Sequence, residues 1–181
     1  MKLSHVVFVA AVAAGCGQSS GPRVATVSST IALTSDDATL WVVNPDADSV
    51  TVIDPTARTV LAEIALGPTP TVDAAGRYEP PIKPRALAIL PDDSKVYVAG
   101  ETADAVFVLD VKTRRVLGTI PVAAAPVGVV AAPDGSAVYA VSHEAAVVTK
   151  IDPKRDAAVG TLDVGEHPWG ASISADGKLL Y

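Results

Sequence analysis

The 181-residue chain contains a single cysteine, Cys16. One cysteine excludes an intrachain disulfide, a CxxC zinc site and a CxxCH haem-attachment site within this sequence. Basic residues are also few, with 14 Lys and Arg against 20 Asp and Glu, and the formal net charge of -6 argues against a nucleic-acid partner. We therefore expect no nucleic acid, no metal and no cofactor on this sequence, and a haem would belong only to a region beyond residue 181.

Aromatic residues are scarce as well, at 4% of the chain, and 14 prolines and 13 glycines are scattered along it. Such frequent breakers exclude long helices, while 49% apolar residues exclude a disordered chain. The composition predicts one globular, all-β domain.

The first residues resemble an export signal. Lys2 is followed by nine apolar residues, 6–14, which are too few to span a bilayer that needs about 20 residues in a helix. We interpret residues 1–15 as a signal peptide and residues 16–27 as the mature N-terminus and a tether.

The tetrapeptide Ala13-Ala14-Gly15-Cys16 resembles the bacterial lipobox, although Ala13 stands where Leu is usual. The resemblance implies that Cys16 is acylated and that the exported protein is anchored to a lipid bilayer, in the periplasm or at the cell surface. Gly17 follows in place of the Asp associated with inner-membrane retention, which favours the outer membrane. An ordinary signal peptide with an incidental Cys16 is the alternative.

A period of 42 residues organises the rest of the chain. Tyr97, Tyr139 and Tyr181 follow this spacing, and residues 84–125 and 126–167 share 13 identities over 42 aligned positions. The period divides residues 28–181 into blade 1 (28–70), an insertion (71–83), blade 2 (84–125), blade 3 (126–167) and a partial blade 4 (168–181).

Each repeat predicts four short β-strands separated by turns. The third strand ends at an Asp in all three full copies, Asp54, Asp110 and Asp152, and this recurrence favours a turn-forming role over catalysis. Runs such as 105–109 are apolar on both faces, which is typical of a sheet covered on both sides. Four-stranded units of about 40 residues with both faces covered indicate a β-propeller of four-stranded blades.

Three segments of blade 2, residues 91–100, 105–110 and 116–122, together with Trp41-Val42-Val43-Asn44, resemble the YVTN β-propeller repeat family. The resemblance extends over residues 28–181. It implies a propeller scaffold and leaves the activity open, because unrelated functions share this fold. About 3.3 blades are present against the four to eight of a closed ring, so we expect the natural chain to continue beyond residue 181.

Four residues are candidates for ligand binding because they vary between copies. His143 stands where the other blades have Pro45 and Glu101, and His167 stands where blade 2 has Ala125. Arg85 and Trp169 share one position at the start of the first strand, which lies nearest the axis in propellers, so they are predicted to line the channel mouth. Packing of Trp169 between blades is the alternative.

Acidic residues gather in the loop between the second and third strands of the repeats. They are Asp46, Asp48, Glu101, Asp104 and Glu144. Such a ring of carboxylates suits calcium, but an EF-hand-like ligand spacing is lacking, so a solvated rim is expected instead.

Two functions follow from these observations. The first is a non-catalytic binding or scaffold module of the bacterial cell envelope, which recognises a protein, a glycan or a small ligand through its rim loops and insertion. The second is the N-terminal propeller part of a redox enzyme, whose c-type cytochrome or di-haem peroxidase-like region would lie beyond residue 181.

Overall fold

The computed structural model describes residues 27–181, and strands, turns and loops make up this whole stretch without a helix. The predicted signal peptide, the predicted acylation site at Cys16 and all but the last residue of the tether lie outside the described residues. Within the described part, no helix is long and apolar enough to cross a membrane.

Twelve strands form three four-stranded antiparallel sheets, one in each full repeat. The sheet of blade 1 contains β1 (Ile31–Leu33), β2 (Leu40–Asn44), β3 (Ser49–Asp54) and β4 (Thr59–Ala65). The sheet of blade 2 contains β5 (Pro84–Ile89), β6 (Lys95–Gly100), β7 (Ala105–Asp110) and β8 (Arg115–Pro121). The sheet of blade 3 contains β9 (Pro126–Ala131), β10 (Val138–Ser142), β11 (Val147–Asp152) and β12 (Ala157–Asp163). The fold is therefore all-β, as predicted.

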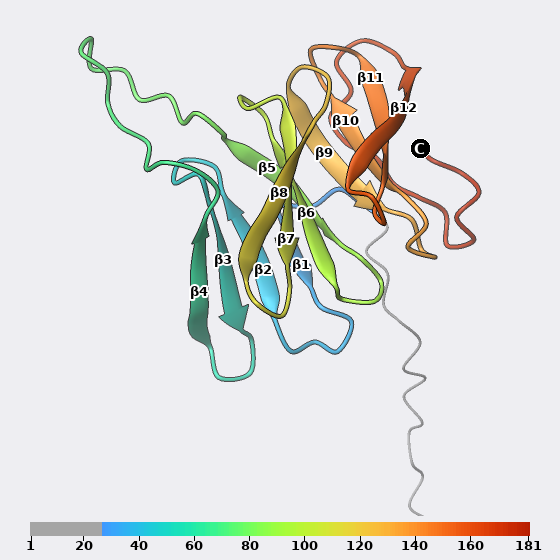
Figure 1. Ribbon diagram of the computed structural model, residues 1–181, viewed down its shortest axis with the longest axis horizontal. Coiled ribbons are helices and arrows are strands. Elements are labelled where there is room, and N and C mark those ends of the chain that lie inside the picture. Colours follow the sequence, from blue (N-terminus) through green and yellow to red (C-terminus); the bar gives the residue numbers. More distant parts are fainter. Residues whose placement is uncertain (1–26) are drawn as a thin grey trace, which may run out of the picture.

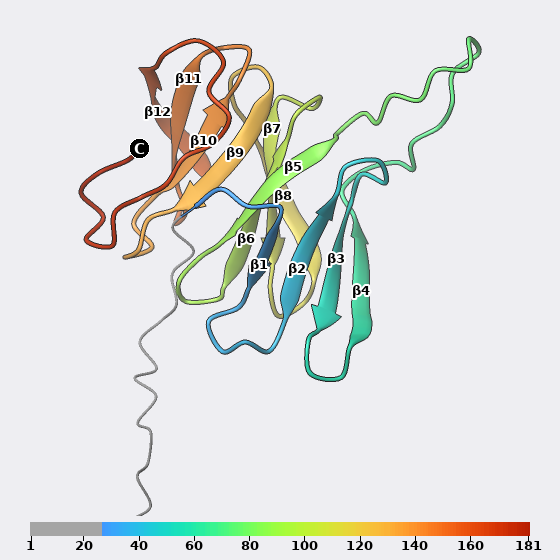
Figure 2. The ribbon, with the colours of Figure 1, turned by 180° about the vertical axis from the view of Figure 1, so that it is seen from behind.

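The three sheets are arranged side by side in an open arc, with blade 2 between the other two (Figure 1). Their first strands lie together on the inner side, where β5 contacts both β1 and β9 (Figure 2). The arrangement is propeller-like, and the described blades do not close into a ring.

Blade 2 is buried on both faces, which confirms the prediction from its apolar strands. Leu87, Val98 and Phe107 face blade 1 in one hydrophobic cluster, whereas Tyr97 and Val108 face blade 3 in another. Alternate residues of a strand point to opposite faces, so an unbroken apolar run fills two interfaces at once.

The Asp that ends each third strand forms the following turn, as expected. Asp54 Oδ1 accepts hydrogen bonds from the backbone N–H groups of Thr56 and Ala57, both at 2.8 Å. Asp110 Oδ1 accepts from the N–H of Thr113 at 2.5 Å. These carboxylates are part of the scaffold.

Residues 168–181 lie against blade 3 without forming a complete sheet. Ile173 pairs with Leu180 in an isolated antiparallel bridge, and Ile173 packs with Val130 of β9. Val27 pairs with Ser172, and two residues later Ser29 pairs with Leu87 of β5. The segment before β1 therefore joins the partial fourth blade to blade 2 along the inner side of the arc.

The insertion, residues 71–83, projects from the arc as a long loop (Figure 1). Near its tip, Val72 pairs with Tyr78, and the Asp73 carboxylate pairs with the Arg77 guanidinium at 2.8 Å. Its return to β5 is fixed by Asp48, whose Oδ1 accepts a 2.7 Å hydrogen bond from the N–H of Lys83. Only the base of the insertion is thus tied to blade 1 by a buried carboxylate.

Candidate functional site

A cavity of about 460 Å³ opens where the first strands of the blades meet, and we call it the axial cavity. Its lining consists of Ser28, Ser29, Thr30, Pro45, Arg85, Ala86, Val127, Trp169 and Gly170. Arg85, Val127 and Trp169 occupy one equivalent position in blades 2, 3 and 4, so the repeat itself brings them together. The structure places both Arg85 and Trp169 at this cavity, as their position after a repeated proline predicted.

Arg85 supplies the positive charge of the axial cavity. Its Nε lies 2.7 Å from Oε2 of Glu101, and Lys83 Nζ lies 3.2 Å from the same oxygen. Because a guanidinium has five N–H donors, this ion pair leaves the terminal nitrogens of Arg85 with four others. Glu101 thus orients Arg85, and two cations share one carboxylate at the cavity wall.

Trp169 contributes an aromatic surface at the opposite side of the cavity lining. Its side chain is 64% exposed, which excludes the alternative that it is packed between blades. The indole lies against the imidazole of His143, with ring centroids 4.5 Å apart and planes inclined by 45°. One face of the cavity therefore ends in a stacked tryptophan and histidine.

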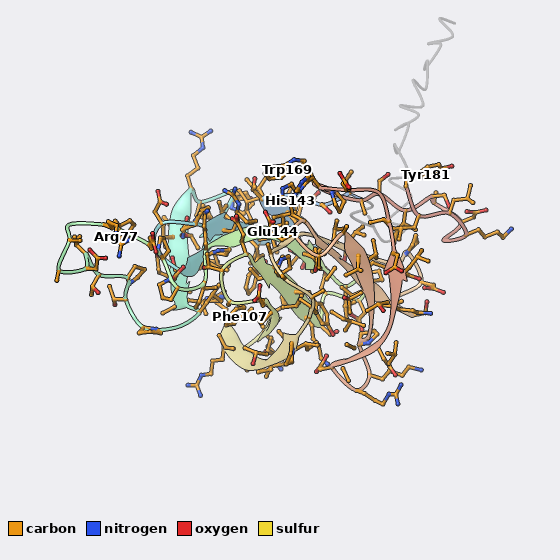
Figure 3. All side chains as sticks on the ribbon, turned by 90° about the horizontal axis from the view of Figure 1, so that it is seen from above. Arg77, Phe107, His143, Glu144, Trp169 and Tyr181 are labelled. Carbon is orange, nitrogen blue, oxygen red and sulfur yellow. The ribbon has the colours of Figure 1, made fainter. Side chains whose placement is uncertain are left out.

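The two candidate histidines, 24 residues apart in sequence, are neighbours in space. The rings of His143 and His167 lie 4.8 Å apart between centroids, and Glu144 Oε1 lies 4.0 Å from His143 Nε2. We call His143, Glu144 and His167 the histidine cluster. Figure 3 shows His143 and Glu144 beside Trp169, away from Arg77 on the insertion.

Local structure fixes both histidines. The N–H of His143 donates a 2.8 Å hydrogen bond to the carbonyl of Ala125, which anchors the loop after β10. His167 has a positive φ of 53°, and Lys83 and Ala125, at the equivalent positions before a proline, have values of 50° and 55°. The backbone geometry at His167 is therefore a property of the repeat, and only the side chain is specific.

The acidic loop residues do not form the solvated rim that their sequence positions suggested. Asp48 is 1% exposed, and its carboxylate accepts hydrogen bonds from the N–H groups of Ile82 and Lys83. Asp104, at the equivalent position, accepts from the N–H of Ala125 at 2.8 Å. The expectation was wrong because these carboxylates fasten each blade to the start of the next one.

Sequence reasoning missed two parts of this region. Ser28 and Ser29 reach the axial cavity because the segment before β1 crosses to blade 2, which no periodic pattern indicates. Glu144 was considered only as a rim carboxylate, although it directly follows a candidate histidine. The adjacency of Glu144 to His143 was the available signal.

Comparisons with known proteins support the fold. No protein-family model and no curated protein matches the chain. Among solved structures, a hydrazine synthase of Kuenenia stuttgartiensis is similar with a TM-score of 0.71 and 27% identity, over 83% of this chain and 40% of that chain. A structure of U3-55K is similar with a TM-score of 0.62 and 16% identity, over 83% of this chain and 46% of that one. The chain thus spans less than half the length of either protein.

Proposed function

We propose that these blades form a binding module whose ligand occupies the axial cavity. The observation that carries this proposal is the meeting of the Arg85 guanidinium and the exposed Trp169 indole at one cavity of about 460 Å³. A volume of this order suits a small ligand or a short segment of a larger one. The guanidinium favours an anionic group, and the indole favours a flat apolar surface such as a sugar ring.

The test uses tryptophan emission, because the chain has two tryptophans and Trp41 is fully buried between blades 1 and 2. The probes are uronic-acid oligosaccharides, neutral glucan oligosaccharides of the same length and short acidic peptides. We expect a saturable change of Trp169 emission with an acidic probe, and at least about tenfold weaker binding for Arg85→Gln. Arg77→Gln is the matched control, because Arg77 lies on the insertion away from Trp169 (Figure 3).

Failure of every probe to saturate the emission change would contradict the proposal. Equal weakening by Arg85→Gln and Arg77→Gln would contradict it too, because a general loss of positive charge would then explain the effect.

We also propose that the module is a YVTN-type envelope lipoprotein, anchored in a bilayer through acylated Cys16. The support is the 42-residue repeat and the small residues that precede Cys16 after an apolar segment. In a bacterial host, Cys16→Ser is expected to abolish incorporation of labelled palmitate and to move the protein from the membrane to the soluble fraction. Unchanged membrane partitioning of the variant would overturn the anchor.

The second candidate function is the propeller part of a redox enzyme. It is favoured by the 27% identity to hydrazine synthase and by the fact that this chain covers 40% of that one. The pyridine haemochrome spectrum of the full natural gene product separates the two candidates. A c-type haem spectrum would support the enzyme, and a haem-free product would leave the binding module alone.

A further inference from the structure

We propose that His143, Glu144 and His167 form a binding site for a divalent transition-metal cation of the zinc type. Each residue offers one ligand atom, and these atoms all lie within 4.8 Å of one another. This inference is independent of the proposed function, because it concerns a separate set of ligand atoms beside the axial cavity. It replaces the expectation of no metal, which considered the sequence spacing of the histidines alone.

The hydrogen bonding of His143 leaves the correct nitrogen free. Its Nδ1 lies 3.1 Å from the carbonyl oxygen of Pro168, and a carbonyl only accepts, so Nδ1 carries the proton. The lone pair is then on Nε2, which is the nitrogen that lies 4.0 Å from Glu144 Oε1. A backbone carbonyl that fixes the tautomer and ring orientation of a histidine is the usual outer support of a metal ligand.

The distances fit a shared ion after small side-chain rotations. Zinc lies about 2.0 to 2.2 Å from nitrogen and oxygen ligands, so two ligand atoms around one ion are roughly 3.4 Å apart at a tetrahedral angle. The 4.0 Å separation of His143 Nε2 and Glu144 Oε1 exceeds this by a fraction of an ångström. Glu144 and His167 are both exposed, so their side chains are free to close the remaining gap.

One ligand is rigid and two are adjustable, which favours capture of an ion from solution. The His143 side chain is 17% exposed and is held by Pro168 and by the indole of Trp169. Its rigidity lowers the entropic cost of ordering the site, since only Glu144 and His167 must be fixed on binding. The indole also removes water from one face of the imidazole.

The donor set identifies the class of cation. Two imidazole nitrogens and one carboxylate oxygen suit zinc, nickel and copper rather than calcium or magnesium, which prefer oxygen ligands alone. Three protein ligands leave a fourth tetrahedral position for water or for an oxygen atom of a ligand. We therefore infer a Zn²⁺ site with one open position, next to Trp169 at the edge of the axial cavity.

The experiment uses the full, untagged chain and Zn²⁺ in competition with a metallochromic indicator. Co²⁺ is a second probe, because its visible absorption reports the coordination geometry. We expect one Zn²⁺ per chain, with affinity reduced at least about tenfold in both His167→Ala and Glu144→Gln. Co²⁺ should also quench the emission of Trp169, which packs on the ligand His143.

Glu166→Gln is the matched control, because this exposed carboxylate directly precedes His167 and is outside the cluster. It is expected to change the affinity less than about twofold. Thermal melting by circular dichroism shows that each variant is folded, and both exposed cluster positions tolerate substitution without loss of core packing. All variants retain His5 and Cys16, so any binding at those residues appears equally in each of them.

Either of two results would overturn the site. One is the absence of stoichiometric Zn²⁺ binding by the unaltered chain. The other is binding that His167→Ala and Glu144→Gln weaken no more than Glu166→Gln does. Both results leave the ligand test of the axial cavity unaffected, since that test reads the dependence on Arg85.

Discussion

The hydroxyl of Tyr97, on β6 of blade 2, donates a 2.6 Å hydrogen bond to Oδ1 of Asp156, in the turn between β11 and β12 of blade 3. Lys95 Nζ lies 2.6 Å from the other oxygen of the same carboxylate. Asp156 stands at the position where the other blades have Arg58 and Arg114. This contact therefore belongs to the interface of blades 2 and 3 and is not repeated elsewhere in the described arc.

Tyr97→Phe tests the contribution of this bond at neutral pH. The ring stays fully buried between the blades, while the Asp156 carboxylate loses one of its two partners. We expect the free energy of unfolding to fall by about 1 kcal/mol, because the partly exposed carboxylate regains water in place of the hydroxyl. Tyr139→Phe, which removes a hydroxyl from the half-buried equivalent residue, should change it by less than half as much. Chemical denaturation of both variants measures the difference.

The same residue predicts alkaline destabilisation. Burial raises the pKa of Tyr97 above its ordinary value of 10.0, and the hydrogen bond and negative charge of Asp156 raise it further. The unfolded chain therefore loses this proton near pH 10 while the folded chain retains it, so stability is complete below that pH and declines above it. Melting temperatures measured between pH 8 and 11 should fall more steeply for the unaltered chain than for Tyr97→Phe. Parallel curves would contradict the assignment.

Asp48→Ala is expected to loosen the base of the insertion. The change leaves the backbone N–H groups of Ile82 and Lys83 without their buried acceptor, which costs about 2 kcal/mol. The backbone itself accepts alanine here, since Ala146 has a φ of 53° at the equivalent position of blade 3 and Asp48 has 49°. Asp46→Ala, two residues earlier and exposed, is the control. Denaturation gives the loss of stability, and hydrogen exchange of the Lys83 amide should accelerate only in Asp48→Ala.

The repeated parts of the fold could be predicted from the sequence, because identical local chemistry recurs at a fixed period. Asp54 and Asp110 end their strands and form turns as expected, and the apolar run 105–109 fills two interfaces. Tyr139 shows the limit of this reasoning. It was expected to be buried like Tyr97, but the short segment 168–181 covers it only partly.

The site could be predicted only in its components. Arg85 and Trp169 were identified because their column lies nearest the axis, and the cavity does contain both. The approach of His143 to His167 was not predictable from a spacing of 24 residues, because it depends on how blade 3 packs against the following segment. The same reason applies to Asp48, whose burial results from a contact with residues 34 and 35 positions later in the chain.

Gly128→Ala tests the close approach of three segments beside the axial cavity. A Cβ atom at this position would lie 2.9 Å from Ser28 Oγ and 3.1 Å from the Cα of Gly170. Blade 2 has Ala86 at the equivalent position, so the restriction comes from the crossing segment before β1 and not from the repeat. We expect a loss of about 1 to 3 kcal/mol in unfolding free energy.

Gly160→Ala is the control for this substitution, because a Cβ atom there meets no other atom within 4 Å. It should leave the protein as stable or more stable by about 0.5 kcal/mol, since alanine restricts the unfolded chain. Similar losses for both variants would show that glycine is needed for strand conformation in general and would contradict the steric explanation.

The turn carboxylates predict how the protein responds to acid. The backbone N–H of Thr113 lowers the pKa of Asp110 below its ordinary value of 3.8, and the N–H of Lys154 does the same for Asp152, with help from the Arg155 side chain. A lowered pKa in the folded state means that the unfolded chain takes up protons first, so the stabilisation is present above about pH 4 and is lost as the pH falls through the folded values. Melting temperatures should therefore decline steadily between about pH 4 and pH 2. Asp110→Asn should lower stability at neutral pH and flatten this decline, because the amide keeps an acceptor oxygen but cannot titrate, whereas Glu166→Gln should leave the slope unchanged. An acid decline of equal slope in Asp110→Asn and the unaltered chain would show that the turn carboxylates do not govern it.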